Sequence, residues 1–265
     1  MKLGVFDSGL GGMLITAAIR KALPDIDILY LGDTLHVPYG NRSEETICHY
    51  TTRCIDYLFR QNCQLIIMAC NTASASALRK IQQGYLLDHY PDRRILGVIV
   101  PTIEYALDSG HEKLGLIGTH YTVRSNVYAE ELRKINPAIR LFQTAAPLLV
   151  PLIENGGMKW IPEILDDTLA PLLSEKIDSL LLGCTHYVCL KNLIRRRYGI
   201  DVMAQDDIIP LKLKEYLVRH PEIFGVLSRT GETRFILTDL TENYEHTASQ
   251  LYGAPVALGR IILET

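Results

Sequence analysis

Short apolar runs alternate along the chain with segments of helical spacing. Leu3–Phe6, Ile26–Leu31 and Leu65–Ala69 are almost free of charge, which is typical of strands buried on both faces. Met13–Leu23 has apolar residues at helical spacing and stops before a proline. The same criteria predict further helices at 43–58, 73–83, 121–135, 160–173 and 244–251, and strands at 95–100, 113–117, 139–144, 179–182 and 234–237.

This alternation predicts an α/β fold with parallel sheets covered on both faces. The pattern restarts near residue 113, so we expect two similar doubly wound lobes with the active site in the cleft between them. Residues 1–98 plus 208–265 would form the first lobe, and residues 99–207 the second. The chain would then cross between the lobes near 98–102 and near 205–210.

Two short matches hint at an internal duplication. An apolar strand is followed by Cys70-Asn71-Thr72 in the first half and by Cys184-Thr185 in the second, 114 residues later. A weaker match pairs Ser8 with Thr119, 111 residues later. The similar offsets suggest a repeated unit, although two short matches can also arise by coincidence.

Composition narrows the possible functions. The 265 residues are 48% hydrophobic and 22% charged, an ordinary globular mixture with room for two domains. The net charge of −3 argues against nucleic acid as a partner. No apolar run approaches the roughly 18 residues of a membrane helix, and polar Asp7-Ser8 follows the first strand too soon for a signal peptide. We therefore expect a cytoplasmic protein with no membrane partner.

The six cysteines are sparse and form no CxxC pair, so neither a disulfide framework nor a zinc site is expected. A free cysteine is usually a small buried hydrophobic residue, and we interpret Cys48, Cys54, Cys63 and Cys189 in that way. Cys70 and Cys184 differ, because each follows an apolar strand and has polar neighbours. Two thiols facing each other across a cleft could remove and return a proton on opposite faces of a carbon. A structural role for both thiols stays open at this point.

Polar residues gather where the predicted strands end, which is where parallel sheets bind ligands. The loop Gly9-Leu10-Gly11-Gly12 matches neither a P-loop nor GxGxxG, so a small carboxylate is a better candidate ligand than a nucleotide. A tight turn from strand to helix explains the glycines equally well. No lysine follows a recognisable pyridoxal phosphate motif, and no residues have metal-ligand spacing. We therefore expect neither pyridoxal phosphate nor a metal.

Three other residues could assist the thiols. His186 lies two residues after Cys184, a spacing that on a strand puts both side chains on one face. Its imidazole could adjust the pKa of the thiol, although a lone histidine is more often structural. Asp7 could serve Cys70 in a similar way. Glu154, before Asn155-Gly156-Gly157, is on residue type alone a solvated loop carboxylate.

Four motifs together resemble the bacterial glutamate racemases, in order from residue 3 to the C-terminal helix region. They are Val5-Phe6-Asp7-Ser8-Gly9-Leu10-Gly11-Gly12, Gly32-Asp33-Thr34 with Val37-Pro38-Tyr39-Gly40, Ala69-Cys70-Asn71-Thr72-Ala73, and Gly183-Cys184-Thr185-His186-Tyr187. The resemblance implies a two-lobed, cofactor-independent isomerase that interconverts L- and D-glutamate and supplies D-glutamate for peptidoglycan. We also expect a homodimer.

The resemblance implies roles for individual residues. Cys70 and Cys184 match the two catalytic thiols, and Asp7, His186 and Glu154 match groups that assist them. The residues that would hold glutamate are Asp7, Ser8, Tyr39, Gly40, Asn71, Thr72, Thr185 and His186.

Some residues depart from the family pattern, and two alternative functions stay open. Val100-Pro101-Thr102, Cys189 and Gln205-Asp206-Asp207 replace more usual family residues near the crossings and after the second thiol. His186-Tyr187 favours glutamate, because the related aspartate racemases typically carry Glu at the histidine position. Aspartate racemisation is one alternative, and a two-lobed binding protein without chemistry is another.

Overall fold

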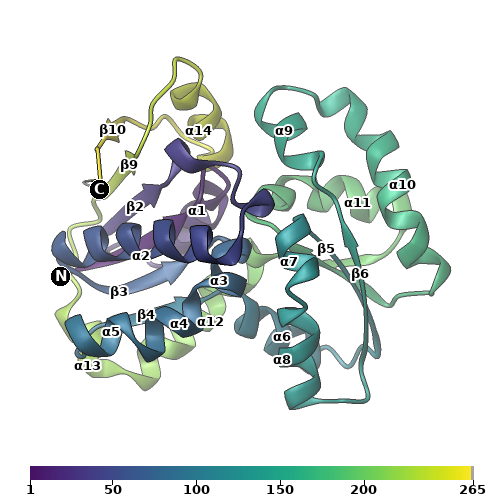
Figure 1. Ribbon diagram of the computed structural model, residues 1–265, viewed down its shortest axis with the longest axis horizontal. Coiled ribbons are helices and arrows are strands. Elements are labelled where there is room, and N and C mark those ends of the chain that lie inside the picture. Colours follow the sequence, from purple (N-terminus) through teal and green to yellow (C-terminus); the bar gives the residue numbers. More distant parts are fainter. Residues whose placement is uncertain (264–265) are drawn as a thin grey trace.

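The computed structural model describes residues 1–263, and within them ten strands form two sheets (Figure 1). All strand pairs are parallel, as the sequence pattern predicts. The first sheet has the order β10-β9-β2-β1-β3-β4, and the second has the order β6-β5-β7-β8. The first sheet comprises β1 (Lys2–Asp7), β2 (Ile28–Gly32), β3 (Cys63–Met68), β4 (Arg94–Gly97), β9 (Thr233–Leu237) and β10 (Leu258–Arg260). The second comprises β5 (Lys113–Gly118), β6 (Arg140–Ala145), β7 (Ser179–Gly183) and β8 (Asp201–Met203).

The second sheet repeats the order of four strands of the first. β2-β1-β3-β4 corresponds to β6-β5-β7-β8, so β3 and β7 occupy equivalent places. Cys70 follows β3 and Cys184 follows β7, while Ser8 and Thr119 follow the equivalent strands β1 and β5. The common order therefore supports the internal duplication that the two sequence matches suggest.

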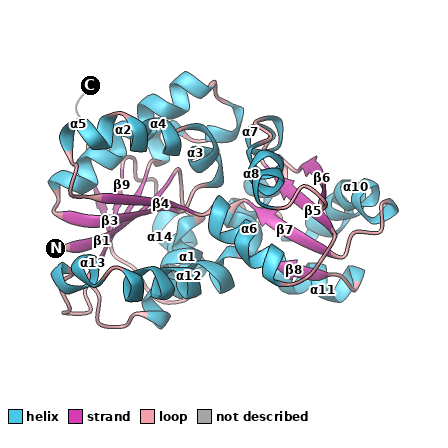
Figure 2. Cartoon of the chain, turned by 90° about the horizontal axis from the view of Figure 1, so that it is seen from below, coloured by secondary structure: helices cyan, strands magenta, loops and turns pink. Residues whose placement is uncertain are grey.

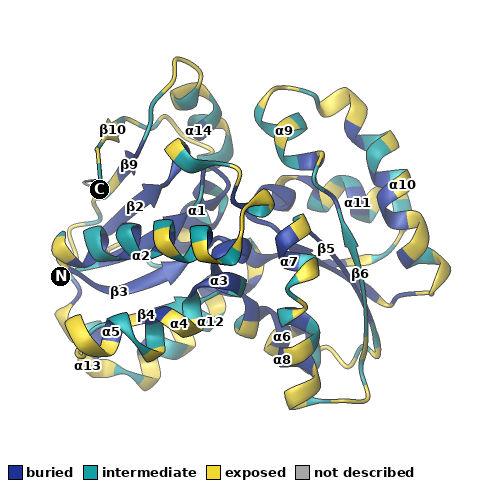
Figure 3. Cartoon of the chain, in the orientation of Figure 1, coloured by how far each residue is buried: buried dark blue, intermediate teal, exposed yellow. Residues whose placement is uncertain are grey.

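Helices cover both faces of the first sheet (Figure 2). Leu65 and Ile67 of β3 pack into a core shared with α1 (Gly12–Ala22) and α12 (Gln205–Arg219). Ile66 and Met68 point the other way, into a core shared with α2 (Glu44–Arg60). Side chains alternate between the faces of a strand, so a strand between two helix layers must be apolar throughout. In Figure 3 the central strands β2 and β3 are buried, and the helices beside them are exposed in part.

The remaining helices complete these layers. In the first lobe they are α3 (Asn71–Ser76), α4 (Leu78–Gln83), α5 (Tyr85–His89), α13 (Pro221–Val226) and α14 (Tyr244–Tyr252). In the second they are α6 (Ile99–Asp108), α7 (His120–Arg124), α8 (Val127–Ile135), α9 (Leu149–Glu154), α10 (Ile161–Ser174) and α11 (Lys191–Tyr198). No helix of residues 1–263 is both long enough and apolar enough to cross a membrane.

Some predicted elements are wrong in detail. The expected strand at 95–100 ends at Gly97, and Ile99 begins α6, where Ile99, Ile103 and Ala106 are buried at helical spacing. A short apolar run does not distinguish a strand from a buried helix turn. The helix expected at 73–83 is divided between α3 and α4, and the one expected at 121–135 is interrupted at Asn126, whose φ is +57°.

The two predicted crossings fall at the starts of helices rather than in loops. α6 begins at Ile99 and α12 begins at Gln205. The first sheet draws its strands from residues 2–97 and 233–260, and the second from residues 113–203. The exact lobe boundaries at 98 and 208 stay a prediction.

Candidate active site

A cavity of about 240 Å³ lies where the carboxyl ends of strands from both sheets approach one another. Both Cys70 and Cys184 line it, one from each sheet. Its volume is below the ~300–1,000 Å³ typical of drug-sized ligands, so it suits a small molecule. The other predicted site residues that line it are Ser8, Tyr39, Gly40, Asn71, Thr72, Glu154, Thr185 and His186.

Cys70 occupies the turn between β3 and α3. Its Sγ accepts a hydrogen bond from the Ala73 amide at 3.4 Å and lies 3.2 Å from Ser8 Oγ. Burial raises the pKa of the Cys70 thiol to about 12, and the negative charge of Asp7 adds to this effect, while the bonds from Ser8 and Ala73 oppose it. Cys70 is therefore a neutral thiol near pH 7.

Cys184 has a different set of neighbours. Its Sγ lies 4.0 Å from His186 Nδ1, and His186 Nε2 lies 2.7 Å from Glu154 Oε1. Burial alone would lower the pKa of His186, but its hydrogen bonds to Cys184 and Glu154 and their negative charges raise that pKa well above the usual value. A protonated His186 can thus connect the second thiol to a carboxylate.

Two expectations about these groups need correction. The strand β7 ends at Gly183, and His186 lies in the 3₁₀ helix η4 (Thr185–Leu190), so a helical turn and not strand alternation brings it to Cys184. Glu154 is not a solvated loop carboxylate. It ends α9, its side chain is only 27% exposed, and it pairs with His186.

The remaining cysteines fit the expectation only in part. Cys54 and Cys63 are fully buried among apolar side chains, as expected. Cys48 is half-buried, and Cys189 is exposed on η4, which contradicts the prediction for Cys189. None of these four residues lines the cavity that holds the two catalytic candidates.

Asp7 lies beneath the cavity rather than on its wall. It is 1% exposed, and its carboxylate accepts hydrogen bonds from the Gly9 amide at 2.9 Å and from Thr185 Oγ1 at 3.1 Å. Burial raises the pKa of the Asp7 carboxyl, although the charge of His186 and these hydrogen bonds oppose the rise. The side chain that touches Cys70 is Ser8, whereas Asp7 bonds to the residue next to Cys184.

Glycines allow the two lobes to approach at this point. A β-carbon on Gly11 would lie 2.4 Å from Thr185 Oγ1 and 2.5 Å from His186 Nδ1. A β-carbon on Gly40 would lie 2.7 Å from Thr119 Cβ. Real β-carbons do not come so close to other atoms, so both positions require glycine. The Gly9 amide donates to the Asp7 carboxylate, so the anion that this amide binds is a side chain of the protein itself.

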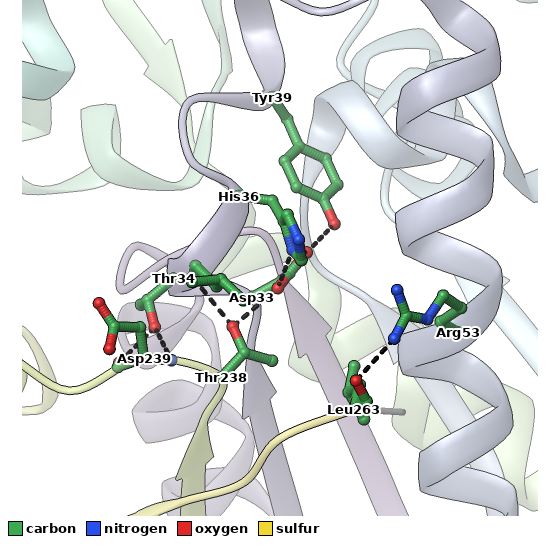
Figure 4. A network of polar contacts seen from close by, with 9 residues as sticks. Asp33, Thr34, His36, Tyr39, Arg53, Thr238, Asp239 and Leu263 are labelled. Carbon is green, nitrogen blue, oxygen red and sulfur yellow. Dashed lines mark hydrogen bonds and ion pairs between the residues drawn. The ribbon is translucent and has the colours of Figure 1, made fainter. Parts of the chain in front are cut away.

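A buried carboxylate holds the loop that carries Tyr39 and Gly40 (Figure 4). Asp33 is fully buried and accepts hydrogen bonds from Tyr39 Oη at 2.5 Å and from Thr238 Oγ1 at 2.7 Å. His36 Nδ1 lies 2.8 Å from the same carboxylate. Tyr39 lines the cavity, and its hydroxyl donates to Asp33 and not to a ligand. Thr238 follows β9, so the C-terminal part of the chain supports this loop.

Three residues that come after the first sheet's strands β1–β4 in the chain were not among the predicted site residues. Thr119 lines the cavity, and its Oγ1 lies 2.9 Å from Thr72 Oγ1. Its position at a strand end, offset from Ser8 by the repeat distance, was an available signal. Gln205 and Tyr128 contact the side chain of Asn71, and no motif marks either of them.

Comparison with known proteins identifies the family. A model of the family described as Asp/Glu/Hydantoin racemase matches residues 13–205. The glutamate racemase of Aquifex aeolicus (strain VF5) is 36% identical over 259 residues, which cover 97% of this chain and 96% of that protein. The crystal structure of glutamate racemase from Francisella tularensis subsp. tularensis SCHU S4 in complex with D-glutamate matches with a TM-score of 0.90 at 28% identity, covering 99% of this chain and 98% of that one. The glutamate racemase structure from Aquifex pyrophilus matches with a TM-score of 0.79 at 34% identity, covering 98% of each chain. This chain therefore belongs to the Asp/Glu/Hydantoin racemase family.

Proposed function

We propose that this protein is a glutamate racemase that uses Cys70 and Cys184 as its two acid–base groups and needs no cofactor. The observation that carries the proposal is that one thiol from each lobe lines the same small cavity. The full-length similarity to glutamate racemases supports glutamate as the substrate. In the cell the enzyme would supply D-glutamate for peptidoglycan from the cytoplasm. The homodimer stays a prediction.

The reaction needs one proton transfer on each face of the substrate Cα. In the conversion of L-glutamate, the Cys184 thiolate takes the Cα proton, and the bonding electrons move into the carboxylate to give a planar carbanion. The Cys70 thiol then donates its proton to the opposite face. The product is D-glutamate, Cys184 is now the thiol, and Cys70 is the thiolate. For D-glutamate the two roles are exchanged.

The surroundings of each sulfur are consistent with these roles. The raised pKa of Cys70 keeps its thiol protonated near pH 7, which prepares it to act as the acid for L-glutamate. The ammonium group of a bound amino acid adds a positive charge, which favours the thiolate that the reverse direction requires. His186, held by Glu154, would stabilise the thiolate of Cys184. Asp7 would relay or hold a proton beneath the site, although its hydrogen bonds run to Gly9 and Thr185.

The polar wall of the cavity is suited to a dicarboxylic amino acid. Ser8, Asn71 and Thr72 line it with side chains that can donate hydrogen bonds, Thr185 donates to Asp7 and offers its oxygen as an acceptor, and Tyr39-Gly40 also line it. Aspartate is one methylene shorter and would leave donors for the distal carboxylate unpaired. A site built to bond a group rejects a ligand that misplaces it, so we expect kcat/KM for glutamate to exceed that for aspartate by at least roughly a hundredfold.

Circular dichroism with each pure enantiomer of glutamate and aspartate tests this function. The protein is first dialysed against a chelator and assayed without added metal or pyridoxal phosphate. We expect both glutamate signals to decay to zero. Comparable rates for aspartate would instead indicate a broader amino-acid racemase. A protein that binds glutamate without any loss of signal would be a binding protein.

A further inference from the structure

Asn71, the residue directly after Cys70, has a side chain that is held from the other lobe. It is 2% exposed and begins α3 of the first lobe. Gln205, at the start of α12 after β8, and Tyr128, in α8 after β5, are both fully buried beside it. Neither of these two residues lines the cavity, whereas Asn71 does.

The two amides form a reciprocal pair. Asn71 Nδ2 donates to Gln205 Oε1 at 2.9 Å, and Gln205 Nε2 donates to Asn71 Oδ1 at 2.8 Å. Tyr128 Oη also donates to Asn71 Oδ1, at 2.7 Å, and accepts from Gln205 Nε2 at 3.3 Å. Both acceptor sites of the Asn71 oxygen are therefore in use, and the Gln205 nitrogen contacts both that oxygen and the Tyr128 hydroxyl.

This arrangement leaves one donor of Asn71 for another partner. A reciprocal amide pair uses the N–H bond that lies on the same side as the carbonyl oxygen. The second N–H bond of Nδ2 consequently points away from Gln205, and among residues 1–263 it has no protein hydrogen-bond acceptor. In this arrangement the Tyr128 hydroxyl donates to Asn71 Oδ1 and lies 3.3 Å from Gln205 Nε2.

We propose that Gln205 is a positioning residue that, with Tyr128, orients the Asn71 amide so that its free N–H bond binds a carboxylate oxygen of the substrate. The inference rests on the proposed racemase function and adds a residue to it. Gln205 lies in the Gln205-Asp206-Asp207 segment that departs from the usual family residues. Since Gln205 follows β8 of the second sheet and begins α12, which packs on the first sheet, this substrate contact also depends on how the two sheets are placed.

Gln205→Leu is the main test, and Gln64→Leu is its matched control. Gln64 is also a buried glutamine with a side-chain hydrogen bond, to the Asp92 carbonyl, but it lies outside the cavity. Loss of a hydrogen bond to a charged group should raise the KM for both enantiomers roughly 10- to 100-fold in Gln205→Leu, with a smaller change in kcat. Calorimetry should show a similar weakening of the Kd for D-glutamate. The Gln64→Leu protein should match the wild type in both constants.

Gln205→Glu separates a loss of Asn71 orientation from a loss of side-chain packing. It also replaces Gln205→Leu as the test if the leucine variant does not fold. A buried carboxyl group keeps its proton to a higher pH than a free one, and the protonated form can donate to Asn71 Oδ1 as the amide does. The KM should thus be near the wild-type value at about pH 6 and approach the Gln205→Leu value at about pH 9, because the ionised form repels that oxygen.

The outcomes separate the two proposals. This inference alone would be overturned if the wild-type protein turns over glutamate and the KM of Gln205→Leu lies within about twofold of the KM of Gln64→Leu. A flat pH dependence of the Gln205→Glu KM would also overturn it. A wild-type protein without racemase activity would contradict the proposed function, and this inference with it.

Discussion

Cys70 and Cys184 end equivalent strands of two sheets with the same strand order, yet different groups contact their sulfur atoms. Within residues 1–263, the hydrogen-bond partners of Cys70 are neutral groups, Ser8 Oγ and the Ala73 amide. Cys184 has an imidazole that is itself bonded to a carboxylate. The backbone positions are thus alike in the two lobes, whereas the polar environments are not. A duplicated scaffold can place two thiols at equivalent positions while each lobe surrounds its thiol with different groups.

The largest expected effect comes from removing either thiol. Under the proposed mechanism every turnover uses both, so Cys70→Ala and Cys184→Ala should each lower kcat for racemisation by on the order of 10³-fold or more. The loss should appear with both enantiomers as the starting substrate, measured by circular dichroism. Cys48→Ala, which changes a half-buried cysteine outside the cavity, is the control and should stay within a few-fold of the wild type. Near-normal racemisation by either active-site variant would contradict the two-thiol mechanism.

The second prediction compares the partners of the two thiols. His186→Asn removes a charged partner of Cys184 and should lower kcat/KM by roughly 10²-fold, whereas Ser8→Ala removes a neutral partner of Cys70 and should cost less, because charge-assisted bonds are about twice as strong. The enantiomers are equally stable, so kcat/KM must fall equally in both directions. The individual kcat values, measured from each enantiomer, are free to differ. A larger loss in Ser8→Ala than in His186→Asn would show that the comparison between the lobes is wrong.

The smallest effect is expected at Glu154, which contacts Cys184 only through His186. Glu154→Gln removes the negative charge that raises the pKa of His186, so that pKa should fall towards its ordinary value. The imidazolium then loses its proton at a lower pH than in the wild type. We expect kcat/KM close to wild type at about pH 6 and several-fold lower at about pH 8. A pH profile parallel to that of the wild type would mean that Glu154 does not control His186.

Much of the fold follows from local pattern. Strands that are buried on both faces are apolar throughout, and the sequence pattern alone predicts two parallel sheets with the cysteines at the ends of β3 and β7. The pattern fails where an apolar run continues from strand into helix, as it does from Gly97 to Ile99. Nothing in the spacing of apolar residues distinguishes those two conformations.

Some residues of the candidate site can be predicted from the sequence, and others cannot. Residues at strand ends, such as Cys70 and Cys184, are found by their position in the sequence. Glu154 is not, because its pairing with His186 depends on how α9 packs beside η4, and its own neighbours suggest a solvent-exposed loop. Gln205 and Tyr128 are harder still, since each contacts Asn71 across the boundary between the two sheets.

The most direct test of the account is the fate of the Cα proton in deuterated water during the first few per cent of conversion. Each enantiomer is incubated with the enzyme, and deuterium at Cα is measured in recovered substrate and in product by mass spectrometry after the enantiomers are separated. If Cys70 and Cys184 act on opposite faces, the product carries deuterium and the remaining substrate keeps its proton, from either direction. If deuterium enters substrate and product together from the earliest times, a single base serves both faces, and the proposed division of roles between the two lobes is wrong.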